Sequence, residues 1–385
     1  MRTKALVVNS PGGEFIYRDV EVNDDIRDTE VLVQIVATGI CHTDINFSQH
    51  DIDGMFPAIL GHEGAGIISK VGLKVTNVEV GDYVILSYTS CGECKYCMRK
   101  QTSFCGDWEL DNFGIGRGED GSKAYEIPSE EEGGGTEITS HFFGQSCFSN
   151  FAVANARCCV RVGGPGSDLD LSSLAPLGCG IMAGAGAMLN VLKPSSEDIV
   201  CVVGAGAVGL AAIMALNLLE KKPRQIIAVD MLDERLKLAK KYGATHVIKP
   251  TKEKGLQSTL KRITNFEGID ASIDTTGKPE VVADLLEATA KLGTVCSVGV
   301  GELDAAVSIN MFNAVNTGRK FVGCCMGNSY PPEFLPKLIQ GWKDGMFPFT
   351  DLITRYDAED MEKAKADVLS GKAVKAVLTW GAPDS

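Results

Sequence analysis

The pattern of strand-like and helix-like segments changes near residue 180, and this change restricts the folds that the chain can adopt. After it, β-branched runs of strand length alternate with helix-length segments, as where 199–203 precedes an Ala/Leu-rich stretch. Such alternation predicts βαβ units with a parallel sheet. Before it, short runs such as 31–37, 66–71 and 83–86 are separated by Gly and Pro, which predicts an all-β region with long loops. We therefore expect an α/β protein with a doubly wound parallel sheet in one domain and mostly β-structure in another.

The length of 385 residues is also sufficient for two domains. We expect the mostly-β domain in residues 1–180, the parallel-sheet domain in 181–324, and a return segment in 325–385 that completes the first domain. The acidic, glycine-rich stretch 128–140 is expected to be a surface loop. Residues 199–219 are uncharged and long enough to span a bilayer, but their glycines and their change from β-branched to Ala/Leu-rich composition favour a strand, a turn and a buried helix.

Charge and cysteine content limit the expected partners and compartment. The formal net charge of −13 repels phosphate backbones, so nucleic acid is not an expected partner. The first residues contain only a short apolar stretch, which predicts a strand rather than a secretion signal, and no membrane partner is expected. Thirteen cysteines in a chain of this size, without an export signal, predict reduced thiols and metal ligands in the cytoplasm rather than disulfides.

A glycine-rich turn follows the first strand of the parallel-sheet region. Gly204, Gly206 and Gly209 form a G-x-G-x-x-G pattern between a β-branched run and a helical segment. The first glycine makes the turn, the second lets the backbone approach a pyrophosphate, and the third permits close helix packing. Asp230 ends the next strand, where a carboxylate accepts hydrogen bonds from ribose hydroxyls and repels a 2′-phosphate. We therefore expect NAD rather than NADP as the cofactor, and the alternative is that Asp230 is a solvated acid at a strand end.

Four cysteines form a compact group in one loop. Two residues separate Cys91 from Cys94 and two separate Cys94 from Cys97, and Cys105 follows shortly after them. Four thiolates at such spacing can surround one tetrahedral zinc ion and leave no coordination position open to water. We expect a structural zinc site here rather than four neutral thiols.

A second set of possible zinc ligands is spread over three segments. Residues 41–44 read Cys-His-Thr-Asp, residues 61–64 read Gly-His-Glu-Gly, and residues 177–180 read Leu-Gly-Cys-Gly. Each segment alone is weak, because a lone cysteine beside glycine is usually a small core residue. Two thiolates and one imidazole together give zinc three protein ligands and one open position, which is the arrangement of a catalytic site.

With these motifs and the Gly-His-Glu-Gly-Ala-Gly run at 61–66, the chain resembles the medium-chain zinc-dependent alcohol dehydrogenases from end to end. The resemblance implies a Rossmann-type domain, a GroES-like catalytic domain, two zinc ions per subunit, and hydride transfer between a zinc-bound alcohol and NAD. It also implies a role for each matching residue. For the reaction centre these are Cys41, His62 and Cys179 as catalytic zinc ligands, Cys91, Cys94, Cys97 and Cys105 as structural zinc ligands, Glu63 as a carboxylate that approaches the zinc, Asp44 as the partner that orients His62, and Thr43 as the first group of a proton relay.

Two positions differ from the well-known animal enzymes of this family. Asn46 stands where they have the histidine that ends the relay, so water is expected to finish it, and Ala183 replaces a threonine near the cofactor. The cofactor contacts that the resemblance implies are made by His42 and Lys375 with the pyrophosphate, by Arg235 with the adenosine ribose, and by Val208, Val298 and Val300 with the nicotinamide.

The substrate and the assembly are inferred from the same resemblance. Residues 41–44 and 142–151 resemble those of aryl- and allylic-alcohol dehydrogenases, and Ser87 and Tyr88 belong to a stretch that lines the alcohol pocket in relatives. We therefore expect a primary aromatic or allylic alcohol as the substrate. The alternatives are a glutathione-dependent formaldehyde dehydrogenase, a family member with non-redox chemistry, and a non-catalytic cofactor-binding protein. Relatives form dimers or tetramers through their cofactor domains, so a homodimer or homotetramer is expected, with 295–300 as a possible edge.

Overall fold

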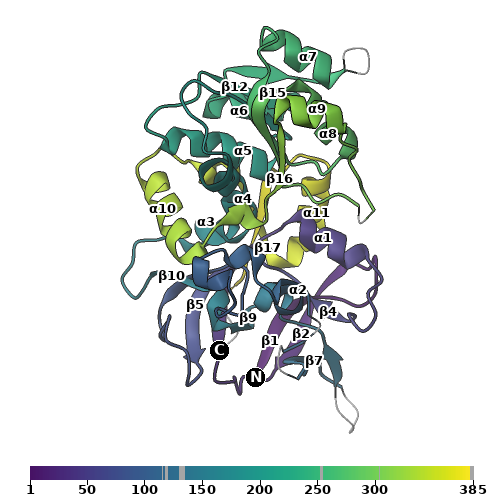
Figure 1. Cartoon of the computed structure of the whole chain (residues 1–385). Helices are drawn as coiled ribbons and strands as arrows, with labels where there is room; N and C mark the ends of the chain where they lie inside the picture. Colours follow the sequence, from purple (N-terminus) through teal and green to yellow (C-terminus); the bar gives the residue numbers. More distant parts are fainter. Residues whose placement is uncertain (115, 118–119, 130–134, 252–254, 303, 382–385) are drawn as a thin grey trace. The chain divides into compact units, whose positions relative to one another are not determined.

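The computed structural model describes residues 1–114, 116–117, 120–129, 135–251, 255–302 and 304–381 (Figure 1). It divides into two compact units. Unit 1 contains Met1–Cys179, Tyr330–Pro336 and Thr350–Ser385, and unit 2 contains Gly180–Ser329 and Lys337–Phe349. The expected return segment is therefore shared, because 337–349 belongs to unit 2. The acidic residues 130–132 of the expected surface loop lie outside the described residues.

Unit 2 is built on a six-stranded parallel sheet with the order β13-β12-β11-β14-β15-β16. This order places β11 at the centre. From β11 the chain adds strands first on one side (β12, β13) and then on the other (β14, β15, β16), which is the arrangement of a Rossmann-type fold. All five residues of β11 are buried because helices cover both faces of such a sheet. The strands are β11 (Ile199–Val203), β12 (Gln225–Val229), β13 (His246–Ile248), β14 (Ile269–Asp274), β15 (Thr289–Ser297) and β16 (Lys320–Gly323).

The core of unit 2 follows from the alternation of side chains along β11. Ile199, Cys201 and Val203 point to one face and pack with Leu260 of α7 and Leu285 of α8. The α-helices of unit 2 are α4 (Gly180–Gly186), α5 (Ala207–Ala215), α6 (Asp233–Tyr242), α7 (Leu256–Ile263), α8 (Pro279–Ala288) and α9 (Met311–Thr317). Helix α10 (Pro331–Lys343) begins in unit 1 and ends in unit 2. The stretch 199–219 is thus a strand, a turn and a buried helix, as the sequence predicts.

Unit 1 contains two sheets. One is antiparallel, with the order β4-β1-β2-β7-β8, and the other has the order β10-β6-β5-β3-β18-β17, with β9 also pairing with β3. The three runs predicted as strands from the sequence fall within β3, β5 and β6. The strands are β1 (Arg2–Val8), β2 (Phe15–Val22), β3 (Glu30–Gly39), β4 (Ala58–Ile59), β5 (Gly64–Val71), β6 (Tyr83–Leu86), β7 (Tyr125–Ile127), β8 (Thr136–Ile138), β9 (Phe151–Asn155), β10 (Cys159–Gly163), β17 (Ile353–Asp357) and β18 (Lys375–Thr379).

Helices in unit 1 are few and short, and the last segment of the chain adds strands to the larger sheet. β18 pairs with β3 in antiparallel fashion and with β17 in parallel. The helices are α1 (His42–Gln49), α2 (Trp108–Phe113), α3 (Leu171–Leu174) and α11 (Met361–Leu369). The prediction of an α/β protein with a second, mostly-β domain is confirmed.

None of the individual helices in the described ranges combines the length and the apolar composition that a membrane span requires. One bent pair of helical segments, Leu171–Gly178 with Gly180–Leu192, meets the length and composition requirement only when both are taken together.

Candidate active site

Three distant segments of unit 1 bring possible metal ligands together. The ligand atoms of Cys41, His62, Glu63 and Cys179 all lie within 4.8 Å of one another. Cys41 directly precedes α1, His62 lies two residues before the start of β5, and Cys179 follows a short 3-10 turn at Ala175–Gly178. The Nε2 atom of His62 is buried and has no hydrogen-bond partner among the described residues, so its lone pair is available to a metal ion. Two sulfurs and this nitrogen are the donor set that a catalytic zinc site requires.

Asp44 holds two of these segments in place. Its side chain is fully buried; Oδ1 accepts hydrogen bonds from His62 Nδ1 at 2.7 Å and from the Gly61 amide at 3.1 Å. Oδ2 accepts the amide of Cys41 at 3.0 Å, as part of the capping box that begins α1. Because Nδ1 donates to Asp44, Nε2 carries the free lone pair and faces the cysteines. The expected placement of Asp44 behind His62 is therefore what the structure has.

Mutual contact shifts the pKa values of the two thiols in this centre in opposite directions. A hydrogen bond from Cys179 lowers the pKa of the Cys41 thiol well below its usual value, against the effect of burial, and His62 contributes in the same direction. The same contact with Cys41, together with burial, raises the pKa of Cys179. A thiolate at Cys41 is the form in which cysteine binds zinc.

Glu63 and Lys375 form a buried ion pair next to the ligands. The Lys375 ammonium contacts Glu63 Oε2 and donates to the Ile40 carbonyl oxygen at 2.9 Å. Burial would lower the pKa of Lys375, but the charges of Glu63, Cys41 and Cys179 together outweigh it, so this pKa lies above its usual value. The structure thus gives the ammonium two partners within unit 1. Its expected contact with a pyrophosphate stays a prediction.

The proposed relay residues lie on the first turns of α1. The sulfur of Cys41 lies 3.5 Å from Thr43 Oγ1, and Thr43 is half-buried. Asn46 is exposed one turn later, and its carbonyl oxygen contacts His50 Nδ1 at 2.7 Å. The side chain of His42 is exposed. Thr43 therefore lies beside the ligand cluster, whereas Asn46 is in contact with solvent.

An aromatic wall surrounds the His62 ring. The ring of Phe143 stacks on His62 with centroids 4.4 Å apart, and Phe142 meets it edge-on at 5.5 Å. Phe47 and Phe113 continue the wall, because each has its centroid within 6.0 Å of the Phe142 centroid. The segment that carries Phe142 and Phe143 is predicted from the sequence, whereas Phe47 and Phe113 are not. These two rings come from separate helices, so no periodic pattern in the sequence indicates them.

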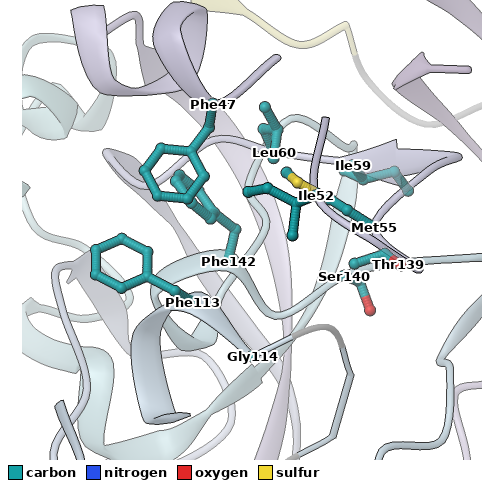
Figure 2. Close-up of a pocket in the computed structure, with 10 residues that line it drawn as sticks. All are labelled: Phe47, Ile52, Met55, Ile59, Leu60, Phe113, Gly114, Thr139, Ser140 and Phe142. Carbon is teal, nitrogen blue, oxygen red and sulfur yellow. The ribbon is translucent and has the colours of Figure 1, made fainter. Parts of the chain in front are cut away.

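An apolar pocket lies beside Phe142 (Figure 2). It measures about 310 Å³ including space that is open to solvent, and the ring of Phe142 takes part both in its lining and in the contact with His62. No lining residue is charged. The lining consists of Phe47, Ile52, Met55, Ile59, Leu60, Phe113, Gly114, Thr139, Ser140 and Phe142.

Ser87 and Tyr88 are not free to offer their hydroxyls to a ligand. Ser87 is fully buried, and its Oγ donates to the Gly178 carbonyl oxygen at 2.6 Å. The hydroxyl of Tyr88 lies 2.7 Å from Thr102 Oγ1. Both hydroxyls are thus used inside the protein.

The four-cysteine loop has the geometry of a closed metal site. The sulfurs of Cys91, Cys94, Cys97 and Cys105 lie within 4.8 Å of one another, and those of Cys91 and Cys97 are 3.9 Å apart. A tetrahedral zinc ion with Zn–S bonds of about 2.3 Å requires sulfurs about 3.8 Å apart. Backbone amides donate to three of the sulfurs at 3.3–3.4 Å. Such bonds lower the pKa of Cys94 to about 6, which favours the thiolate.

The glycine turn of unit 2 has the features expected of a dinucleotide site. Gly204 has a φ of +89°, in the left-handed region, and a Cβ on Gly209 would lie 1.8 Å from the Gly204 carbonyl oxygen. A Cβ on Gly206 would meet nothing within 4 Å, so this side of the turn is open to a ligand. Asp230 Oδ2 accepts the Ala205 amide at 2.6 Å, which places the carboxylate beside the turn.

The other predicted cofactor residues of unit 2 lie at the same edge of the sheet or on the helices that begin there. Val208 is half-buried in the first turn of α5, and Val298 is half-buried just after β15. Val300 is exposed. Arg235 is buried in α6, where burial lowers its pKa and Asp230 opposes the change.

Comparisons with known proteins agree with both parts of the site. The model of the alcohol dehydrogenase GroES-like domain matches residues 27–163, and that of the zinc-binding dehydrogenases matches 207–340. The geraniol dehydrogenase of Castellaniella defragrans is 33% identical over 98% of this chain and 97% of its own. The S-(hydroxymethyl)glutathione dehydrogenase of Komagataella pastoris is 33% identical over 98% of each chain. The crystal structure of benzyl alcohol dehydrogenase from Acinetobacter calcoaceticus is similar at a TM-score of 0.89 and 33% identity, covering 99% of this chain and 100% of the other. The chain therefore belongs to the medium-chain family of zinc-dependent alcohol dehydrogenases.

Proposed function

We propose that this enzyme interconverts primary alcohols and their aldehydes. In these substrates the reacting carbon is attached to an aromatic ring or to a carbon–carbon double bond. Its family makes it an alcohol dehydrogenase that acts on small alcohols or aldehydes with zinc and NAD as cofactors, so the non-catalytic alternative is set aside. The narrower substrate class is carried by one observation, the stacking of Phe143 on His62 beside the edge of Phe142.

Aromatic rings beside the reacting centre suit a flat, polarisable substrate. Rings attract one another in stacked and edge-on geometries, each worth about 0.5–1.5 kcal/mol beyond the area that they bury. The pocket beside Phe142 has an apolar, uncharged lining, which suits a hydrocarbon group and offers no partner for a carboxylate. Two relatives act, by their names, on geraniol and on benzyl alcohol, which are an allylic and an aromatic alcohol.

The residues of the chain contribute orientation, a proton path and a dry environment. When bound, zinc supplies a Lewis acid and NAD supplies a hydride acceptor. Asp44 fixes the tautomer and the orientation of His62. Thr43 accepts the hydroxyl proton of the alcohol and passes it toward solvent beyond Asn46, a role supported by the position of its hydroxyl 3.5 Å from the Cys41 sulfur. The rings of Phe142 and Phe143 exclude water from the His62 side of the site.

Matched pairs of alcohols test the substrate class. We expect kcat/KM with NAD to be about tenfold or more higher for benzyl alcohol than for cyclohexylmethanol, and for geraniol than for citronellol, because each pair differs in unsaturation and little in size. The measurement is the initial rate of NADH formation by the zinc-loaded enzyme. Equal rates within each pair, or a preference for ethanol over benzyl alcohol, would contradict the proposal.

A glutathione-dependent formaldehyde dehydrogenase is the second candidate, favoured by relatives named S-(hydroxymethyl)glutathione dehydrogenase. The hydroxymethyl adduct of glutathione carries two carboxylates, and a site for it needs cations. The lining of the pocket beside Phe142 contains no lysine or arginine. Formaldehyde oxidation that depends on added glutathione, at a kcat/KM above that for benzyl alcohol, would favour this candidate.

We also propose that the chain forms a homodimer or homotetramer through α9 and the edge strand β16. Met311, Phe312 and Val315 of α9 and Phe321 of β16 are exposed apolar residues, and such patches mark association surfaces. The change Phe312→Asp is expected to reduce the mass in light scattering. Phe266→Asp is the matched control, because Phe266 is 79% exposed and Phe312 is 77% exposed. An unchanged mass for Phe312→Asp would contradict this surface.

A cytoplasmic location completes the proposal. It is supported by the thirteen cysteines, none of which forms a disulfide in the described residues and most of which lie outside the two clusters. Fractionation of cells that produce the protein, followed by detection in the soluble and membrane fractions, tests it.

A further inference from the structure

A left-handed turn carries the aromatic wall. His141, Phe143 and Ser146 have φ values of +71°, +54° and +47°, a region that residues with a Cβ disfavour. Such a backbone persists only where surrounding contacts impose it, and it is frequent at functional sites. The Ser146 hydroxyl donates to the Ile59 carbonyl oxygen at 2.7 Å and accepts the Phe142 amide at 2.9 Å. Side chains of the turn therefore anchor it to the segment that precedes His62.

Gln145 of the same turn connects the His62 segment with the end of β6. Its side chain is fully buried, and Nε2 donates to the His62 carbonyl oxygen at 3.0 Å and to the Ser87 carbonyl oxygen at 2.6 Å. Oε1 accepts the Gly64 amide at 3.3 Å. Two carbonyl acceptors on one side and an amide donor on the other fix the orientation of the side-chain amide. A glutamate could keep only the contact with Gly64.

Ser87 extends this connection to the third zinc ligand. Its hydroxyl donates to the carbonyl oxygen of Gly178, the residue before Cys179, at 2.6 Å. The backbones approach closely here, because a Cβ on Gly178 would lie 2.1 Å from the Leu86 carbonyl oxygen. His62 and Cys179, far apart in the sequence, are thus joined by the path His62–Gln145–Ser87–Gly178.

We propose that Gln145 and Ser87 are positioning residues of the catalytic zinc site, which hold His62 and Cys179 at ligand distance before the metal binds. Asp44 joins Cys41 to His62, so the two connections together fix all three ligands. Partners outside the ligand shell that orient ligands commonly contribute 10–100-fold to metal affinity. This inference rests on the zinc site of the proposed function and not on the choice of alcohol.

Zinc release from the full-length enzyme tests the inference. The enzyme, loaded with two zinc ions, is exposed to a chelator, and release is followed with a metal-sensitive dye. The phase that disappears in Cys179→Ser identifies the three-ligand site, and the four-cysteine site is the internal reference. In Gln145→Ala and in Ser87→Ala, we expect the first phase to be about tenfold faster or more, with the reference phase unchanged. Gln145→Glu should behave like Gln145→Ala, because it cannot donate to either carbonyl oxygen.

Thr289→Ala is the matched control. It removes a buried hydroxyl that donates to a backbone carbonyl oxygen, that of Leu285 at 2.7 Å, in the other unit. Release at the wild-type rate in the folded Gln145 and Ser87 variants would overturn the inference. Equal acceleration of both phases, or unfolding of both variants, would also overturn it, because the two side chains would then support only the general fold. If the matched alcohols show no preference, the rates of zinc release are unaffected and the inference stands. A wild-type enzyme without zinc at the three-ligand site would instead refute the proposed function itself.

Discussion

Replacing Asp44 with Asn should weaken zinc binding at the three-ligand site far more than it disturbs the fold. The carboxylate accepts three hydrogen bonds, from His62 Nδ1, the Gly61 amide and the Cys41 amide, at 2.7–3.1 Å. Asn can accept with one oxygen only, and its NH₂ group must face one of these donors. One buried hydrogen bond to a charged acceptor is lost, at a cost of about 1.5–3 kcal/mol. At about 1.4 kcal/mol per factor of ten, this is about 10–150-fold in zinc affinity if the cost falls on the bound state.

Competition with a chelator of known affinity measures this effect, together with kcat/KM for the preferred alcohol. Asp82→Asn is the control, because Asp82 is also buried in unit 1 and accepts the Glu79 amide at 2.9 Å and Arg161 Nε at 2.9 Å. It should lose a similar amount of stability in urea unfolding and keep its zinc. A folded Asp44→Asn enzyme with the zinc affinity of the wild type would refute the role given to Asp44.

Three further predictions concern the four-cysteine site, the dinucleotide site and the buried ion pair. Cys94→Ser should reduce the zinc content from two ions to one per subunit and lower the Tm, because three sulfurs cannot close the structural site; metal analysis and thermal unfolding would show this, and two retained ions would contradict it. Asp230→Ser should raise the ratio of kcat/KM for NADP to that for NAD by about tenfold or more, because the carboxylate that repels a 2′-phosphate is gone; an unchanged ratio would mean that Asp230 does not face the ribose. Lys375→Met should lower the free energy of unfolding by about 3–5 kcal/mol, because it removes the buried ammonium that pairs with the Glu63 carboxylate, and adding Glu63→Gln should restore part of it. Equal urea stability of Lys375→Met and the wild type would contradict the importance of that pair.

Local patterns predicted much of this molecule. The four-cysteine loop and the strand at Tyr83–Leu86 depend on neighbours in the sequence, so spacing and side-chain type were sufficient. The three-ligand site could not be predicted from local spacing, because residues 41, 62 and 179 meet only through tertiary contacts. Its motifs were interpreted through their resemblance to a family.

Other features had no signal in the sequence. The left-handed conformation of Phe143, the buried amide of Gln145 and the inward hydroxyl of Ser87 depend on contacts with carbonyl oxygens of distant segments. Neither propensity nor periodicity encodes which carbonyl oxygen a polar side chain will meet. For the same reason Ser87 was expected at the alcohol pocket, although its hydroxyl contacts the protein backbone.

The ion pair between Glu63 and Lys375 has a consequence for synthesis of the protein on the ribosome. Lys375 and its acceptor Ile40 are 335 residues apart, and Lys375 begins the last strand, β18, which pairs with β3. A growing chain that has not reached β18 contains every zinc ligand, yet it lacks the Lys375 ammonium that pairs with the Glu63 carboxylate. Unit 2, in contrast, is drawn mostly from the continuous stretch 180–329. The nucleotide-binding unit is therefore nearly complete before its metal-binding counterpart, which closes only after β18 has been synthesised.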